Sequence, residues 1–138
     1  MSSSPELNIP TVVAEVKAAF ERYDKGLDDN DVAVLDDSFW DHPLTQRFGV
    51  GENLYGHAQI AAFRASRNGT QLQQRARRLE NTIITTFGSD YAVANTEYVL
   101  LRNGQRGRQS QTWVKFPEGW KVVSAHVSLL AETTPQTS

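Results

Sequence analysis

Apolar residues in the first part of the chain recur at steps of three and four. Between residues 11 and 28 this spacing joins Val12, Val16, Phe20, Tyr23 and Leu27. The spacing predicts a helix that buries one stripe of its side chains. Pro10 suits the first turn of this helix, where a backbone N–H has no partner within the helix.

Shorter elements are predicted up to residue 67. The pattern indicates a short helix over 32–37, short strands over 38–40 and 47–50, and a third helix over 57–67. Asn30 or Asp31 can cap the short helix through its side-chain oxygen. Asn68-Gly69 then ends the third helix.

The second half of the chain alternates as strands do. Four long strands are predicted, over 75–87, 91–102, 107–116 and 120–130. Asn103-Gly104 lies between apolar runs, which is a strong signal for a two-residue hairpin turn. That turn sets Tyr98 opposite Gln109.

The inferred register gives the sheet two different faces. A three-residue turn at 117–119 sets Trp113 opposite Val123. The more apolar face is assigned to the helices and carries Thr96, Tyr98, Gln109, Gln111, Trp113, Val123, Ala125, Val127 and Leu129. Its polar groups need partners inside, which indicates a polar-lined cavity between the sheet and the first helix.

The opposite face carries mostly small polar side chains, among them Ser110, Thr112, Ser124 and His126. It is neither strongly apolar nor charged as a free surface usually is. This outer sheet face is therefore a candidate homodimer interface. The alternative is a face exposed to solvent.

Composition fits one domain. The chain has 138 residues, 39% of them apolar and 22% charged, with a formal net charge of −2 and no cysteine. We expect a single domain over 10–131 between flexible tails at 1–9 and 132–138. The near-neutral balance and the lack of a long apolar run argue against nucleic acid and membranes as partners, and a cytoplasmic protein is the default.

One arginine, Arg47, lies among aromatic and aliphatic residues in the stretch 39–56. In one interpretation its methylenes cover apolar neighbours, and its guanidinium meets water, Asp41 or Glu52. In the other, the guanidinium points into a cavity and binds a carboxylate through two hydrogen bonds. Tyr23 is equally open, because a core tyrosine and a cavity-lining tyrosine fit the same helical stripe.

The sequence offers no pattern for metal or cofactor chemistry. The three histidines, His42, His57 and His126, are too scattered for a metal site. No nucleophile elbow or Gly-rich phosphate loop occurs. We expect no cofactor and no metal.

Several motifs occur together between about Val12 and Leu130. They are Phe39-Trp40, Thr45-Gln46-Arg47-Phe48-Gly49, Glu52-Asn53-Leu54-Tyr55-Gly56, Phe63-Arg64 with Arg67, Gly107-Arg108-Gln109-Ser110-Gln111-Thr112-Trp113, Gly119-Trp120 and Ala125-His126-Val127-Ser128. As a set they resemble the AtzH-like branch of the SnoaL-like (nuclear transport factor 2-like) superfamily. The resemblance implies an α+β, cone-shaped fold with three helices packed on a curved antiparallel sheet.

The resemblance also implies a small hydrolase or amidase of nitrogen catabolism, in cyanuric acid degradation. Proteins of this branch are linked to the conversion of 1,3-dicarboxyurea to allophanate, and relatives to oxalurate breakdown. The family's proposed functional pair falls on Tyr23 and Arg47. Arg47 would bind a carboxylate and Tyr23 would act as general acid or base. An association with an amidase is implied as well.

A dianionic substrate needs a second set of donors. The candidates are Arg64, Tyr98, Gln109 and Gln111, with Trp113 beside them. For Arg64 a solvated helix arginine is the alternative.

Three functions stay open. The first is an enzyme acting on a small carboxylate-bearing amide, and the second is an accessory protein that binds such an anion or a partner amidase. The third is a SnoaL-type isomerase or cyclase, which would need an acidic base where the inward face offers glutamines.

Overall fold

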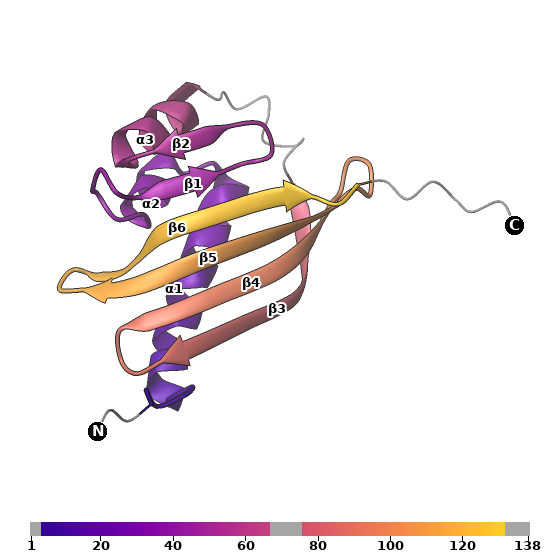
Figure 1. Ribbon diagram of the computed structural model, residues 1–138. Helices are drawn as coiled ribbons and strands as arrows, with labels where there is room; N and C mark the ends of the chain where they lie inside the picture. Colours follow the sequence, from indigo (N-terminus) through magenta and orange to yellow (C-terminus); the bar gives the residue numbers. More distant parts are fainter. Residues whose placement is uncertain (1–3, 67–75, 132–138) are drawn as a thin grey trace, which may run out of the picture.

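The computed structural model describes residues 4–66 and 76–131. Three helices pack on one six-stranded sheet in an α+β fold, as predicted (Figure 1). The helices are α1 (Pro10–Asp29), α2 (Val32–Asp37) and α3 (His57–Ser66). The strands are β1 (Gln46–Phe48), β2 (Asn53–Tyr55), β3 (Arg77–Phe87), β4 (Tyr91–Leu100), β5 (Arg106–Phe116) and β6 (Gly119–Leu129). Their order in the sheet is β2-β1-β6-β5-β4-β3.

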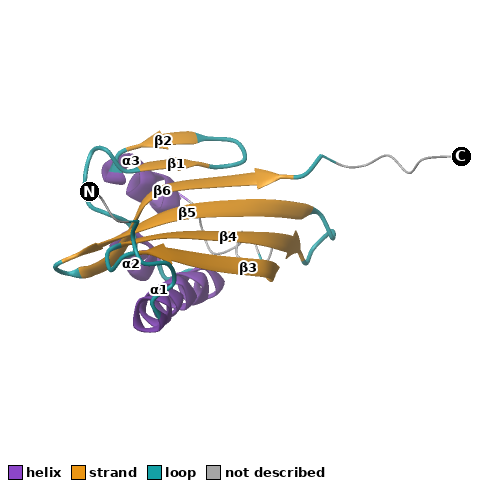
Figure 2. Ribbon diagram, turned by 60° about the horizontal axis from the view of Figure 1, so that its bottom comes forward, coloured by secondary structure: helices purple, strands orange, loops and turns teal. Residues whose placement is uncertain are grey.

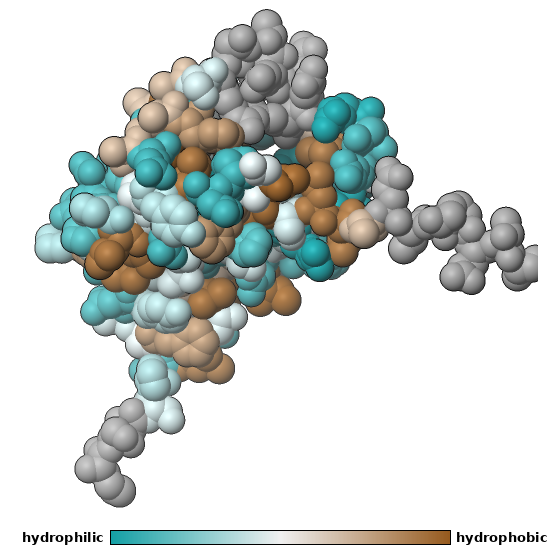
Figure 3. Space-filling model, turned by 45° about the horizontal axis from the view of Figure 1, so that its top comes forward, coloured by the Kyte–Doolittle hydropathy of each residue, from teal (hydrophilic) through white to brown (hydrophobic). Residues whose placement is uncertain are grey.

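The helices lie on one side of the sheet. Figure 1 shows α1 running across the long strands, with α2 and α3 towards β1 and β2, and Figure 2 shows α1 below the sheet. On the face seen in Figure 3, apolar side chains lie in separate groups among polar ones. No helix in the described part of the chain has the length and apolar character needed to cross a membrane.

Helix α1 forms where the sequence predicts it. Pro10 occupies its first turn, and Asn30 closes it in the left-handed conformation, with a φ of 52°. The apolar stripe packs into the core, where the buried residues of α1 include Val12, Val16, Phe20 and Tyr23. The stripe therefore places Tyr23 on the side of the helix that faces the sheet.

The segment between α2 and α3 differs from the prediction. Residues 38–40 form no strand, and Phe39 makes only an isolated bridge with Val122. The short hairpin consists of β1 and β2 instead. Strand β1 also pairs in parallel with β6, where Arg47 lies beside Ala125. No local pattern predicts this pairing, because the two strands are far apart in the sequence.

The register of β4 with β5 differs from the prediction by two residues. Tyr98 pairs with Gly107 rather than with Gln109, because the connection spans 101–105. A shift by two keeps every side chain on its predicted face. Gln109 and Gln111 are accordingly buried, at 3% and 2% exposure.

The predicted register of β5 with β6 is correct before Trp113 and wrong from Trp113 onwards. Gln109 pairs with Val127 as predicted, but a bulge next to Trp113 sets this residue opposite Val122. One extra residue in a strand turns the following side chains to the other face. Val122 is fully buried. The inward position predicted for Val123 is therefore wrong.

Residues 6–8 are bonded to the edge of the sheet, so the flexible tail expected over 1–9 is not free in this part. The Asn8 N–H donates to the Thr86 carbonyl at 3.0 Å, and the Thr86 N–H donates to the Asn8 side-chain oxygen at 2.9 Å. These bonds cover backbone groups of the edge strand β3.

The outer face carries Ser110, Thr112, Ser124 and His126, as predicted. Ser110 pairs with His126 in the β5–β6 register, and both are exposed. Dimer formation through this face stays a prediction.

Gly107 is required where the Tyr98 ring crosses β5. A Cβ at residue 107 would overlap the ring of Tyr98, which is itself buried. We expect Gly107→Ala to lower the free energy of unfolding by about 1 to 3 kcal/mol, the usual cost of overpacking. Gly51→Ala is the control, since a Cβ there would meet nothing within 4 Å. Urea denaturation measures both variants, and a Gly107→Ala protein as stable as wild type would contradict the prediction.

Candidate functional site

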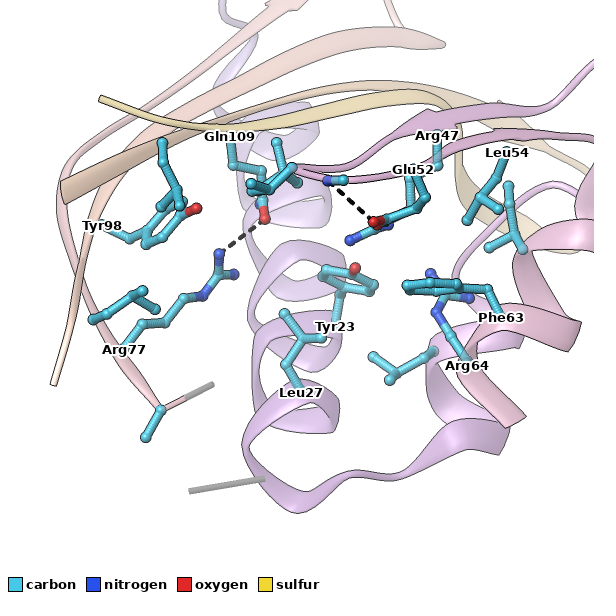
Figure 4. A pocket seen from close by; sticks show the side chains of 18 of the residues that line it. Tyr23, Leu27, Arg47, Glu52, Leu54, Phe63, Arg64, Arg77, Tyr98 and Gln109 are labelled. Carbon is cyan, nitrogen blue, oxygen red and sulfur yellow. Dashed lines mark hydrogen bonds and ion pairs between the residues drawn. The ribbon is translucent and has the colours of Figure 1, made fainter. Parts of the chain in front are cut away.

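A cavity of about 560 Å³ lies between α1, α3, the β1–β2 hairpin and the inner face of the sheet (Figure 4). Its apolar lining includes Leu27, Leu35, Leu54, Ile60, Phe63, Val127 and Leu129. Its polar lining consists of Tyr23, Asp28, Arg47, Glu52, Arg64, Arg77, Tyr98, Arg102 and Gln109. This size and mixture are typical of a site for a small organic molecule.

Arg47 points to the inner face of the sheet, since it pairs with the buried Ala125. Its Nη1 donates to Glu52 Oε1 at 2.9 Å across the β1–β2 turn, and the two side chains are 20% and 21% exposed. Gly49 makes room for this ion pair, because a Cβ there would overlap the Glu52 carboxylate. Arg47 thus has the Glu52 partner of one interpretation and the cavity position of the other.

Tyr23 reaches the same cavity from α1. Its ring lies 5.7 Å from the ring of Phe39, centroid to centroid, and the residue is 4% exposed. No residue in the described part of the chain hydrogen-bonds to its hydroxyl. Figure 4 shows the hydroxyl directed towards Arg47 and Glu52. The structure therefore brings the two predicted residues to one site.

Arg64 is buried, so the alternative of a solvated helix arginine is wrong. Its Nη1 donates to Asp36 Oδ1 at 3.0 Å, and its Cζ lies 4.4 Å from the Phe39 ring centroid. Its Nη2 is buried without a hydrogen-bond partner in the described chain. The His57 ring supports this arrangement, with Nε2 2.8 Å from the Asp36 carbonyl oxygen.

Arg77 lines the cavity but is not among the residues predicted from the sequence. Its Nη1 donates to Gln109 Oε1 at 3.0 Å, and its Nη2 donates to Asp24 Oδ1 at 3.2 Å. Its Cζ lies 5.2 Å from the Tyr98 ring centroid. The available signal was its spacing from Leu79, because residues two apart in a strand share a face.

The remaining predicted binding residues divide into two groups. Tyr98 and Gln109 line the cavity, whereas Gln111 and Trp113 do not. Trp113 Nε1 donates to Gln111 Oε1 at 3.0 Å, and both side chains are buried in the core. This corrects the prediction: an inward-facing strand residue is buried, but only some inward positions border the cavity.

The lining holds more arginines than carboxylates, yet most of the charges are paired. Arg47, Arg64 and Arg77 each bond to one carboxylate. A buried guanidinium needs such a partner, because an unpaired charge away from water is costly. Burial raises the pKa of the Tyr98 hydroxyl and that of the Asp28 carboxyl above their usual values. Within 4–66 and 76–131 no three potential metal ligands come together.

Comparisons with known proteins agree on the fold. A solved structure from Pectobacterium atrosepticum, described as a protein with unknown function from the DUF3225 family, is 54% identical; the match covers 91% of this chain and 95% of that chain, with a TM-score of 0.86. A cystatin-like fold protein from Burkholderia xenovorans is 40% identical over 94% of this chain and 99% of that chain, with a TM-score of 0.85. A nuclear transport factor 2-like superfamily protein from Salmonella enterica is 27% identical over 93% of this chain and 97% of that chain, with a TM-score of 0.68. Among curated proteins there is no match.

The family follows from a separate match. The AtzH-like family matches residues 5–133, which include the whole sheet and all three helices. The resemblance seen in the motifs is therefore confirmed. This chain belongs to the AtzH-like family and has the nuclear transport factor 2-like fold.

Proposed function

We propose that this protein is a small enzyme of nitrogen-compound catabolism that removes carbon dioxide from a carboxylated urea, as in the conversion of 1,3-dicarboxyurea to allophanate. The observation that carries the proposal is the cavity shared by Arg47 and Tyr23, which combines an anchored cation with a hydroxyl that no described residue binds. Membership of the AtzH-like family supports the substrate class.

Arg47 is suited to hold one carboxylate of such a substrate. Its bond to Glu52 restrains the guanidinium, and that bond uses one of its five N–H donors. Two neighbouring donors of a guanidinium form a fork that a planar carboxylate fits. The same lining includes the apolar side chains of Leu54 and Phe63, which lower the local dielectric and so strengthen an ionic hydrogen bond.

Tyr23 supplies a proton in the proposed reaction. Loss of carbon dioxide breaks the bond between the carbamate nitrogen and the carboxylate carbon, and the electron pair stays on the nitrogen. The Tyr23 hydroxyl gives its proton to that nitrogen, and water returns a proton to the phenolate. One dicarboxyurea and one proton thus become one allophanate and one carbon dioxide.

One observation favours a second function, a SnoaL-type isomerase or cyclase with a larger substrate. The cavity of about 560 Å³ has more room than a dicarboxyurea needs, and its lining includes the carboxylates of Asp28 and Glu52. The inward sheet face carries glutamines, as predicted, but α1 contributes Asp28 and the β1–β2 turn contributes Glu52 to the same cavity. These two carboxylates are potential bases for such chemistry.

Turnover measurements separate these functions. Purified protein is incubated with 1,3-dicarboxyurea and with oxalurate, and carbon dioxide, ammonia and oxalate are quantified against the spontaneous rates. Carbon dioxide released from dicarboxyurea without ammonia supports the proposal. Oxalate released from oxalurate indicates hydrolysis of an amide instead. Binding of either compound without turnover indicates an accessory protein, for which a partner amidase would be sought.

Arg47→Lys keeps the positive charge but removes the fork. We expect it to weaken carboxylate binding by about ten- to a hundredfold, as for the loss of a charge-assisted contact worth about 1.5 to 3 kcal/mol. Calorimetric titration measures the change. Arg78→Lys is the control, because Arg78 is 59% exposed on β3 and lies outside the cavity lining. Equal losses in both variants would count against Arg47 as the anchor.

Tyr23→Phe removes only a hydroxyl. We expect turnover of dicarboxyurea to fall by about a hundredfold or more while its affinity stays nearly constant, because general acid catalysis is lost and binding is not. Tyr91→Phe is the control, since Tyr91 is 43% exposed and does not line the cavity. Circular dichroism checks that both variants fold. Undiminished turnover in folded Tyr23→Phe would remove the tyrosine from the mechanism.

Glu52→Gln removes one negative charge beside Arg47 and keeps an oxygen that can accept its hydrogen bond. We expect anionic ligands to bind about three- to tenfold more tightly, because a partly exposed charge contributes on the order of 1 kcal/mol. The gain should shrink at high salt. Glu118→Gln, at the exposed β5–β6 turn, is the control. Weaker binding in Glu52→Gln would indicate that Glu52 acts mainly by orienting Arg47.

A further inference from the structure

The cavity has a second polar end. Figure 4 shows Arg77, Gln109 and Tyr98 on one side of Tyr23, and Arg47 with its carboxylate partner on the other. The proton transfer proposed for Tyr23 does not use Arg77 or Gln109. Their side chains nevertheless line the cavity, and both are largely buried.

Arg77 is held in one orientation at this end. Its bonds to Gln109 and Asp24, at 3.0 and 3.2 Å, use two of its five N–H donors. The Tyr98 ring lies beside the guanidinium, with Cζ 5.2 Å from the ring centroid, and the side chain is 11% exposed. A ligand would therefore meet a guanidinium whose position is already fixed, which lowers the entropy cost of binding.

Gln109 adds a donor that lacks a partner. Its Oε1 accepts from Arg77, so its Nε2 is directed away from that bond. The reversed amide would set two donors against each other, which fixes this orientation. Nε2 is buried, and no residue in the described part of the chain accepts its hydrogen bond. A ligand oxygen would satisfy a donor that is otherwise costly to leave unbonded.

Arg64 also has a buried Nη2 without a partner in the described chain. It lies on the Arg47 side of Tyr23 in Figure 4, packed on Phe39. Arg64 is thus placed to assist the carboxylate that Arg47 holds. The far end of a ligand would meet Arg77 and Gln109 instead.

We propose that Arg77 and Gln109 form a second binding site, which holds a carboxylate or carbonyl oxygen at the far end of a substrate whose first carboxylate is bound by Arg47. The inference rests on the proposed function and deepens it. The cavity would select substrates by an acceptor oxygen at each end and by the distance between the ends. Because Asp24 already balances the charge of Arg77, a neutral carbonyl is accepted as well as a carboxylate.

Calorimetric titration with straight-chain acids tests the second site. Succinate, glutarate and adipate are each compared with butyrate, pentanoate and hexanoate, the monocarboxylates of equal length. We expect the best-fitting dicarboxylate to bind at least about tenfold more tightly than its matched monocarboxylate, as one additional charge-assisted contact would give. The half-amide of that dicarboxylate carries a carbonyl at its second end and so tests whether the second site accepts a carbonyl as well as a carboxylate. We expect the half-amide, too, to bind more tightly than the monocarboxylate.

Gln109→Glu is the sharpest variant, because it keeps the acceptor for Arg77 and replaces the free donor with a carboxylate oxygen. We expect the dicarboxylate to bind at least about tenfold more weakly and the monocarboxylate to change by less than about twofold. Arg77→Lys should act in the same direction, since it keeps the charge and loses the fork. Arg78→Lys, on the same strand and outside the lining, is the control.

The outcomes separate the second site from the proposed function. Equal affinities of wild type for mono- and dicarboxylates, or equal losses for both in Gln109→Glu and Arg77→Lys, would exclude the second site. If circular dichroism shows that Gln109→Glu does not fold, the affinities of Arg77→Lys for mono- and dicarboxylates decide whether the second site exists. Monocarboxylate binding that is unchanged in Arg47→Lys would instead remove the anchor of the proposed function, whatever the Gln109 variant does.

Discussion

The burial of guanidinium groups around the cavity is the constraint on which the arrangement of this fold depends. Arg47, Arg64 and Arg77 come from three different elements, and each is at most 20% exposed. Each donates to a carboxylate at 2.9 to 3.2 Å. Because an unpaired buried charge is strongly destabilising, the hairpin, α2 and α1 must each bring a carboxylate to one of these arginines.

The same pairing determines how the cavity can recognise a ligand. Every buried arginine of the lining already has a counter-charge, so a broad positive potential is not what would attract an anion. Recognition depends instead on the direction of the N–H groups that remain, such as Nη2 of Arg64 and Nε2 of Gln109. N–H donors that point in fixed directions favour a planar ligand whose acceptor oxygens have a matching spacing over anions in general.

Short strand β1 is the element that brings the proposed chemistry to the core. Its parallel pairing with β6 sets Arg47 beside Ala125 on the inner face, and the glycine at position 49 leaves room for Glu52 to reach it. Helix α1 supplies Tyr23 from the opposite side (Figure 4). The two residues of the proposed functional pair therefore come from strand β1 and helix α1, which the packed fold holds in fixed positions relative to each other.

The sequence by itself determined the helices, the long strands and the inward direction of Gln109. The alternation of side chains along a strand is a local property, so an error of two residues in the predicted register left each side chain on its correct face. Its motifs also indicated Tyr23 and Arg47. Only the tertiary structure decided that Gln111 lies in the core while Gln109 borders the cavity, and that Arg77 joins the site. These outcomes depend on where α1 crosses the strands and on a parallel pairing between distant segments, which no local pattern records.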